Sequence, residues 1–259
     1  MQPLERAAYL AHASRPAFGR RLAAAAALIH GADGCAVSVS WGKDSVALLH
    51  LAACVRPDIV VLNARYPNPA ERFADMDRVR DAVLSRPEFA RVRYVEVHTP
   101  GEWEMYERAG GGFAEAVTPA QRAATRWWKA QFEANMGTAQ QAAGCNGVIL
   151  GLRADESHAR RMNAITRGDD YVRADGMRVV LPLQRWSGAD VWAYVASNDL
   201  PWLRIYDGAT TGRELARSGF VFATGGAGAI RRHGVWEDWR RVYPQEFAAW
   251  MARFPELDR

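Results

Sequence analysis

The sequence predicts an α/β fold, a doubly wound parallel sheet with a helical C-terminal extension. Short apolar segments rich in β-formers alternate with segments of helical length and periodicity. Such alternation indicates a parallel sheet with helices on both faces. Of the 259 residues, 49% are hydrophobic and 10% aromatic, which is enough for a large core and excludes a disordered chain.

The elements are expected in a simple order along the chain. Helices are predicted over 4–30 with a break near Pro16, then over 45–55, 70–84, 119–143 and 188–197, the last introduced by Ser187. Buried strands are predicted over 35–39, 58–62, 92–97 and 147–150. Residues 235–257, rich in Trp, Tyr and Phe, are expected to form a docked amphipathic helix, and the Gly-rich pieces 110–112 and 224–228 mobile loops.

Composition narrows the classes of protein. No stretch approaches the ~20 continuous apolar residues of a membrane span, and the first residues lack the apolar core of a signal peptide. We therefore expect a cytoplasmic protein without a membrane partner. The three cysteines are far apart in sequence, which argues against a disulfide framework and a local zinc site. The net charge of +4 suits an anionic partner such as a nucleotide or nucleic acid, although a general preference for Arg explains it equally well.

The loop after the first predicted strand is suited to binding phosphate. It reads Ser40-Trp41-Gly42-Lys43-Asp44-Ser45. Ligands of doubly wound sheets bind at the carboxyl ends of the strands, where this loop lies. Gly42 allows close approach of the backbone, the following helix directs N–H groups at the same point, and Lys43 adds a cation. We expect Asp44 and Ser45 to cap the helix, and Ser40 and Ser45 to offer hydroxyls to phosphate oxygens. The alternative is an ordinary strand-to-helix turn without a ligand. The loop is not a Walker loop, because the second Gly of that motif is absent.

This loop resembles the PP-loop, Ser-Gly-Gly-x-Asp-Ser, of the adenine nucleotide α-hydrolase superfamily, with Trp41 in place of the first Gly. From about Ser38 to Gly226 the chain resembles the phosphoadenosine phosphosulfate (PAPS) reductase family. Three further blocks carry this resemblance: Arg122-Ala-Ala-Thr-Arg-Trp-Trp-Lys129, Gly151-Leu-Arg-Ala-Asp-Glu-Ser157, and Leu181-Pro-Leu-Gln-Arg-Trp-Ser-Gly-Ala-Asp-Val-Trp192.

The resemblance implies a Rossmann-like fold of the adenine nucleotide α-hydrolase (HUP) type. Residues 1–205 are then the nucleotide-binding domain with its N-terminal helices, and 206–259 a C-terminal loop and helical extension packed on it. It implies catalytic roles for Lys43 and Arg153. The nucleotide-binding residues would be Ser38, Ser40, Trp41, Gly42, Lys43, Asp44, Ser45, Asn63, Gly151 and Arg153. Substrate would contact Arg126, Lys129, Arg160 and Arg161, and Mg²⁺ would contact Asp44 and Asp155.

The residues of these blocks have physical alternatives. Arg126 and Lys129 share a helical face, which either meets an anionic substrate or is simply solvated. Arg153 has a planar fork suited to phosphate. Asp155 and Glu156 either hold Mg²⁺, orient Arg153 and Arg160, or form surface ion pairs. We expect the last block to be structural, with Ser187 capping a helix and Val191 and Trp192 facing the core.

The chain also departs from the family in its cysteines. Some relatives bind an iron–sulfur cluster through thiolates, but the matching positions here are Ala123, Ala124, Phe220 and Ala223. The reductases' Cys-Gly-Leu-His tail is also missing, so we expect no cluster and no PAPS reduction.

The chemistry that remains is cleavage of ATP to AMP and pyrophosphate with Mg²⁺, which adenylates a substrate for sulfur transfer or nucleic-acid modification. The acceptor is unknown, with a nucleic acid or a sulfur carrier as candidates, and a homo-oligomer is compatible. The alternatives are a PAPS-using transferase or reductase-like protein and a non-catalytic nucleotide-binding subunit.

Overall fold

The structure is a computed structural model that describes residues 1–67, 74–110, 118–210, 212–214 and 235–255. The chain divides into two compact units, each described by itself below. The first comprises Met1–Asn63, Arg78–Glu96 and Thr138–Trp202, and the second Ala64–Asp77, Val97–Gly137 and Leu203–Arg259. The expected boundary at residue 205 lies near the one at 202, but the second unit also contains two earlier segments. The expected domain division stays a prediction.

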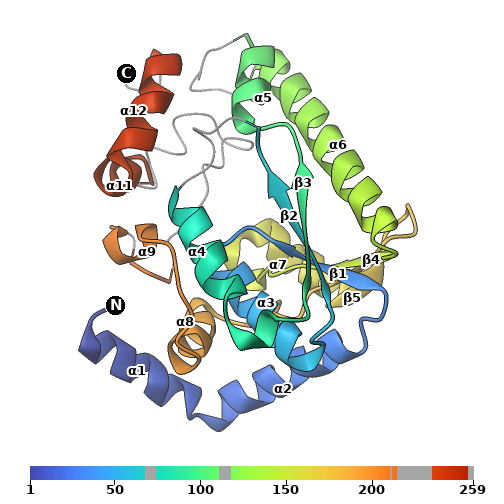
Figure 1. Cartoon of the computed structure of the whole chain (residues 1–259), viewed down its shortest axis with the longest axis vertical. Helices are drawn as coiled ribbons and strands as arrows, with labels where there is room; N and C mark the ends of the chain where they lie inside the picture. Colours follow the sequence, from blue (N-terminus) through green and yellow to red (C-terminus); the bar gives the residue numbers. More distant parts are fainter. Residues whose placement is uncertain (68–73, 111–117, 211, 215–234, 256–259) are drawn as a thin grey trace. The chain divides into compact units, whose positions relative to one another are not determined.

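A six-stranded sheet forms the framework, in the order β3-β2-β1-β4-β6-β5 (Figure 1). The strands are β1 (Cys35–Val39), β2 (Val60–Arg65), β3 (Arg93–His98), β4 (Gly147–Ile149), β5 (Asp170–Val172) and β6 (Arg178–Val180). The central strand β1 is parallel to β2 and β4, and β4 is parallel to β6, whereas β5 pairs with β6 antiparallel. The predicted doubly wound α/β fold is confirmed, with one antiparallel strand at its edge.

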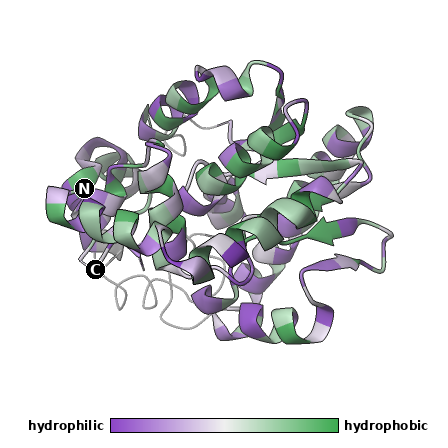
Figure 2. Cartoon of the chain, turned by 90° about the horizontal axis from the view of Figure 1, so that it is seen from below, coloured by the Kyte–Doolittle hydropathy of each residue, from purple (hydrophilic) through white to green (hydrophobic). Residues whose placement is uncertain are grey.

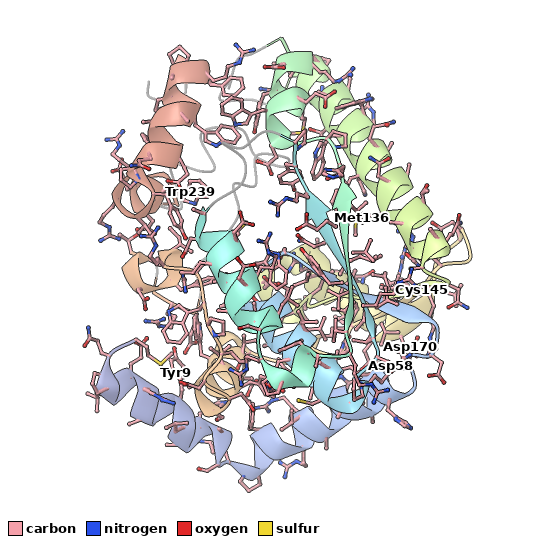
Figure 3. The ribbon with its side chains drawn as sticks, in the orientation of Figure 1. Tyr9, Asp58, Met136, Cys145, Asp170 and Trp239 are labelled. Carbon is pink, nitrogen blue, oxygen red and sulfur yellow. The ribbon has the colours of Figure 1, made fainter. Side chains whose placement is uncertain are left out.

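Four helices of the first unit form a continuous layer. They are α1 (Pro3–Ala13), α2 (Pro16–His30), α3 (Lys43–Val55) and α8 (Gly188–Ser197). Contacts run from β1 to α3, from α3 to α2 and α8, and from α8 to α1. Tyr9 of α1, labelled in Figure 3, stacks on Trp192 of α8. Hydrophobic and hydrophilic residues alternate along the helices (Figure 2), as expected for helices with one buried face.

The carboxylate of Asp190 connects α8 with α1 and α2. Asp190 is 1% exposed, and its Oδ1 lies 2.6 Å from Arg21 Nη2 of α2 and 2.8 Å from His12 Nε2 of α1. Its Oδ2 accepts hydrogen bonds from the amide and hydroxyl of Ser187, whose hydroxyl accepts one from Asp190 N. The predicted Ser187 cap is confirmed, as is the burial of Val191 and Trp192, both fully buried.

Several short elements were not expected from the sequence. They are α5 (Glu102–Arg108), α7 (His158–Arg167), α9 (Ile205–Gly208), the 3₁₀ turns η2 (Pro87–Phe89) and η3 (Ala154–Glu156), and strands β5 and β6. The expected helices over 70–84 and 119–143 are α4 (Ala74–Leu84) and α6 (Pro119–Ala142), while 68–73 and nearly all of the two predicted Gly-rich loops lie outside the described residues.

The C-terminal segment of the second unit contains two helices rather than one. They are α11 (Val235–Val242) and α12 (Pro244–Arg253), and the change of direction falls at Pro244, which cannot donate a helical hydrogen bond. Trp239, Tyr243 and Trp250 are at most 2% exposed, so the segment is docked as predicted. Tyr243 donates a hydrogen bond of 2.7 Å to buried Asp75. Among the described residues, no helix is long and apolar enough to cross a membrane.

Candidate functional site

The site lies where the chain reverses direction across the sheet. After β1 the chain moves outward to β2 and β3, and it then returns to β4 on the other side of β1. Val37 is in register with Ile149, so the loops that follow β1 and β4 leave the sheet at the same edge. Such a switch point forms a crevice at the carboxyl ends of the strands. Both predicted site loops, 40–45 and 151–157, therefore meet here, in the first unit.

The loop after β1 makes a left-handed turn at Trp41, whose φ is 59°. For a residue other than Gly this conformation costs about 1–2 kcal/mol. Gly42 is the N-cap of α3 and makes no side-chain cap. The expected capping by Asp44 and Ser45 is therefore wrong, because their side chains are engaged elsewhere. The Ser45 hydroxyl donates to Gly42 O at 3.0 Å and accepts from Ser40 N at 3.2 Å, which closes the loop on itself.

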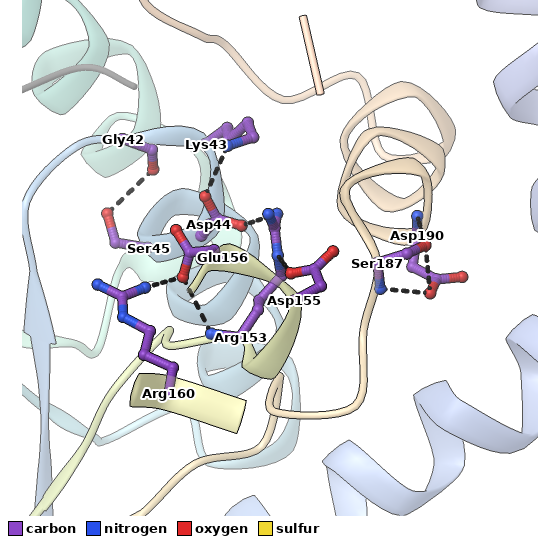
Figure 4. Close-up of polar contacts among 10 residues, drawn as sticks. All are labelled: Gly42, Lys43, Asp44, Ser45, Arg153, Asp155, Glu156, Arg160, Ser187 and Asp190. Carbon is purple, nitrogen blue, oxygen red and sulfur yellow. Dashed lines mark hydrogen bonds and ion pairs between the residues drawn. The ribbon is translucent and has the colours of Figure 1, made fainter. Parts of the chain in front are cut away.

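Asp44 joins two buried cations (Figure 4). Its Oδ2 accepts a hydrogen bond of 2.9 Å from Lys43 Nζ, and its Oδ1 accepts one of 2.5 Å from Arg153 Nη1. Arg153 Nε donates to Asp155 Oδ1 at 3.0 Å. The Lys43 and Arg153 side chains are each 4% exposed, whereas those of Asp44 and Asp155 are 16% and 44% exposed. The network thus has two buried cations and two carboxylates that are more exposed.

Burial lowers the pKa of Lys43 from its ordinary value. Asp44 opposes this shift, and the positive charge of Arg153 adds to it. The Lys43 ammonium and the Arg153 guanidinium both pair with Asp44, and Arg153 pairs with Asp155 as well. Two cations side by side also favour an anion placed next to them.

The segment after β4 holds its charged side chains by local pairing. Glu156 Oε2 accepts from Arg153 N at 3.1 Å and also pairs with Arg160. Ser157 caps α7 by accepting from Arg160 N at 3.2 Å. Of the roles considered for Asp155 and Glu156, orientation of Arg153 and Arg160 is therefore present in the structure.

Gly151 is required by the close approach of the two loops. A Cβ built at this position would lie 3.1 Å from Asp44 O and 3.4 Å from Ser45 N. Its position against the first turn of α3 is a steric feature that the sequence motif did not reveal.

Asn63 and Tyr94 connect the loop to the neighbouring strands. Asn63 is 6% exposed, and its Nδ2 donates to Val39 O at 2.8 Å. Tyr94 OH donates to Asn63 Oδ1 at 3.1 Å, and the Tyr94 and Trp41 rings lie 5.9 Å apart. Ser38 lies within β1, in register with Leu62. Tyr94 was not identified from the sequence, because an aromatic residue in a strand is most often a packing residue.

The remaining predicted substrate-binding residues lie outside this network. Arg161 is exposed on α7. Arg126 and Lys129 are exposed on α6 in the second unit, where Lys129 Nζ lies 3.9 Å from Glu133. Their role toward substrate stays a prediction.

The cysteines are free thiols. Cys35 pairs in register with Gly147, two residues after Cys145, which Figure 3 labels. Burial raises the pKa of Cys35, and Cys145 adds to the rise. Parallel register thus places Cys35 and Cys145 near the starts of two neighbouring strands, β1 and β4. Cys54 is exposed on α3. In the described parts of the chain, no group of three or more His, Cys, Asp or Glu residues is arranged to hold a metal ion.

Comparison with known proteins identifies a family that this chain matches. The sequence model of the phosphoadenosine phosphosulfate reductase domain matches residues 34–230. A phosphoadenosine 5'-phosphosulfate reductase of Xanthomonas oryzae pv. oryzae is 29% identical over 70% of this chain and 69% of its own. Subunit 2 of the sulfate adenylyltransferase of Rhizobium tropici is 24% identical over 64% of this chain and 55% of its own. The crystal structure of a PAPS reductase from Candida auris, in a phosphate complex, superposes with a TM-score of 0.50 at 15% identity, covering 71% of this chain and 84% of that one.

Proposed function

This chain belongs to the phosphoadenosine phosphosulfate reductase domain family, and we propose that it binds ATP and cleaves it to AMP and pyrophosphate, adenylating an acceptor. The named relatives are enzymes of sulfur metabolism, reductases and a sulfate adenylyltransferase subunit, which supports an enzymatic role.

One observation carries the proposal. Two buried cations, Lys43 and Arg153, both pair with Asp44 and so lie side by side at the switch point of the sheet. Two cations gathered at one buried point attract an anionic ligand, and charged groups with shifted pKa values are typical of functional sites. A polyphosphate fits this charge, and α3 begins here without a side-chain cap.

We propose the following chemistry for this site. An acceptor oxygen attacks the α-phosphorus, the bond from that phosphorus to the bridging oxygen breaks, and pyrophosphate leaves with the electron pair. The acceptor then carries the adenylyl group. The barrier is chiefly one of positioning and charge neutralisation, to which Lys43 and Arg153 contribute.

Mg²⁺ fits one part of the site better than another. Both carboxylate oxygens of Asp44 are engaged by Lys43 and Arg153, whereas Asp155 is 44% exposed and uses one oxygen toward Arg153. Mg²⁺ is usually held by one or two carboxylates together with substrate phosphates. We therefore propose Asp155 as the protein ligand of a metal that arrives with the nucleotide, where it would neutralise phosphate charge.

PAPS is the second candidate substrate, because relatives that match most of the chain are named PAPS reductases. Like ATP it is an adenine nucleotide with a phosphate on its 5' carbon and several negative charges, so the same cations would bind it. The third candidate is a subunit that binds a nucleotide but catalyses no reaction.

Pyrophosphate release tests the proposal. The protein is incubated with labelled ATP and Mg²⁺, with a cell extract as the source of acceptor, and pyrophosphate and the mass gained by extract components are measured. Parallel reactions contain PAPS and a thiol reductant, with sulfite as the product. We expect pyrophosphate from ATP and no sulfite from PAPS. Sulfite release would establish the second candidate, and ATP binding without either product would establish the third.

Arg153→Ala is the matched variant for this assay. A charge-assisted hydrogen bond is worth ~1.5–3 kcal/mol, so its loss from the transition state lowers turnover by about one to two orders of magnitude. Arg185→Ala is the control, since the Arg185 side chain is 80% exposed. If circular dichroism and melting are unchanged in Arg153→Ala and pyrophosphate release persists at the parental rate, Arg153 has no part in the reaction.

A further inference from the structure

The loop after β1 contains a residue in a conformation that it does not favour. Trp41 has a φ of 59°, and among the described residues other than Gly only Asp199 shares a positive φ. Gly adopts this region without steric penalty. A large side chain at such a position persists when surrounding contacts determine its conformation.

Those contacts lead from the Trp41 ring to two strands. The side chain is 3% exposed, and its ring lies 5.9 Å from the Tyr94 ring on β3 at an interplanar angle of 54°. Tyr94 OH lies 3.1 Å from both Asn63 Oδ1 and Glu96 Oε1. Asn63, on β2, donates in turn to Val39 O. The residues on both sides of Ser40 are therefore attached to neighbouring strands, Val39 through Asn63 and Trp41 through Tyr94.

We propose that Trp41 is a positioning residue, whose ring is anchored on Tyr94 and holds the phosphate loop in its binding conformation before the nucleotide arrives. The role in binding rests on the proposed function. The ring is too buried to serve as an exposed stacking surface for a base, so Trp41 acts through the backbone of Ser40 and Gly42. Ordering a loop in advance removes its conformational entropy from the cost of binding.

Hydrogen exchange in the free protein tests the anchor. Trp41→Gly removes the ring and keeps the left-handed turn accessible, and Tyr94→Leu removes the partner ring and keeps Trp41. We expect faster amide exchange in residues 40–45 in both variants and exchange close to the parent in Trp41→Phe, which keeps an aromatic ring. Trp192→Phe, in the buried α8, is the control for general destabilisation and leaves this segment unchanged. Unaltered exchange in both Trp41→Gly and Tyr94→Leu would overturn the proposal.

Calorimetry with ATP and Mg²⁺ then tests the consequence for binding. In Trp41→Gly, roughly one more residue must be ordered on binding, so we expect the Kd for ATP to rise about tenfold. In Trp41→Phe, we expect a Kd close to that of the parent. Tighter or equal binding by Trp41→Gly would overturn the role in binding. If the parent binds no ATP, the proposed function fails, whereas the exchange experiment, made without ligand, still decides whether Trp41 anchors the loop.

Discussion

At the residue scale, Lys43 combines burial with charge. Its ammonium pairs with Asp44, and burial depresses its pKa. We predict that Lys43→Ala weakens ATP binding by about one to two orders of magnitude, from the ~1.5–3 kcal/mol of a charge-assisted contact. Calorimetry measures this, with Arg20→Ala, an exposed position on α2, as control. Equal affinity in Lys43→Ala and parent would remove Lys43 from the site.

Gly151 gives a steric test of how closely the two loops approach. We predict that Gly151→Ala destabilises the protein by about 1–3 kcal/mol, because the new methyl group would press on the backbone of Asp44 at 3.1 Å. Gly19→Ala is a matched control within α2, where nothing lies within 4 Å of the new methyl group. This variant should gain about 0.5–1 kcal/mol from helix propensity. Denaturant unfolding measures both, and a loss as large in Gly19→Ala would show that the contact at Gly151 is not the cause.

The candidate site was only partly predictable from these residues. The motif order placed Lys43 and Arg153 at one edge of the sheet, because the loops after parallel strands emerge together. The ion pair of Asp44 with Arg153, 109 residues apart, depends on the register of β1 and β4. The contact of Gly151 with α3 depends on the same register, which no local pattern encodes.

At the element scale, α3, α8 and η2 meet around a buried histidine. His50 Nδ1 lies 2.8 Å from Tyr194 OH on α8, and His50 Nε2 lies 3.2 Å from Glu88 Oε1 in η2. Burial lowers the pKa of His50 below its ordinary value, and Arg86 adds to this shift while Glu88 opposes it. The neutral ring is therefore the form that the fold accommodates.

This histidine predicts a pH dependence of stability. Since the folded pKa is depressed, the unfolded chain binds the proton first. The stability that neutral His50 contributes is present above its unfolded pKa, about 6.5, and is lost as the pH falls through the folded pKa. We predict that the free energy of unfolding declines below about pH 6.5 and that His50→Gln shows a shallower decline. His98→Gln, an exposed histidine, is the control, and parallel curves for the parent and His50→Gln would exclude His50 as the source.

The helices and strands that could not be predicted from the sequence are short or polar. β5 and β6 have three residues each, and each begins with a charged residue, Asp170 and Arg178. β6 forms by pairing with β4, and β5 forms by pairing with β6, so both depend on tertiary contacts. The helix α7 is polar overall and has no buried residue, so it lacks the apolar composition by which α3 and α8 were recognised. Long apolar elements such as β1 and α8 were predicted to within two residues.

At the scale of the whole molecule, the family match begins at residue 34, after α1 and α2. These two helices are nevertheless bound to the matched region, because His12 and Arg21 both contact Asp190 at the start of α8. Asp190 lies in the block 181–192, which resembles a motif of the family. Its buried carboxylate therefore fixes the two helices that precede the family domain.

Iron content is a property of the whole chain that can be measured directly. We predict that the purified protein, even when prepared without oxygen, holds no iron–sulfur cluster. A cluster needs about four thiolate ligands, typically all cysteines, and the sequence has three. Cys35 and Cys145 lie at the amino ends of β1 and β4, opposite to the edge that carries the Lys43 network, and Cys54 lies near the end of α3. Burial raises the pKa of all three thiols, which disfavours the thiolate form that iron requires.

Iron analysis and the visible spectrum test for a cluster, with Cys35→Ser and Cys145→Ser as controls that should change neither the iron content nor the spectrum. Stoichiometric iron with a broad band near ~400 nm, as thiolate-ligated iron gives, would reopen the reductase reading with ligands from a second subunit.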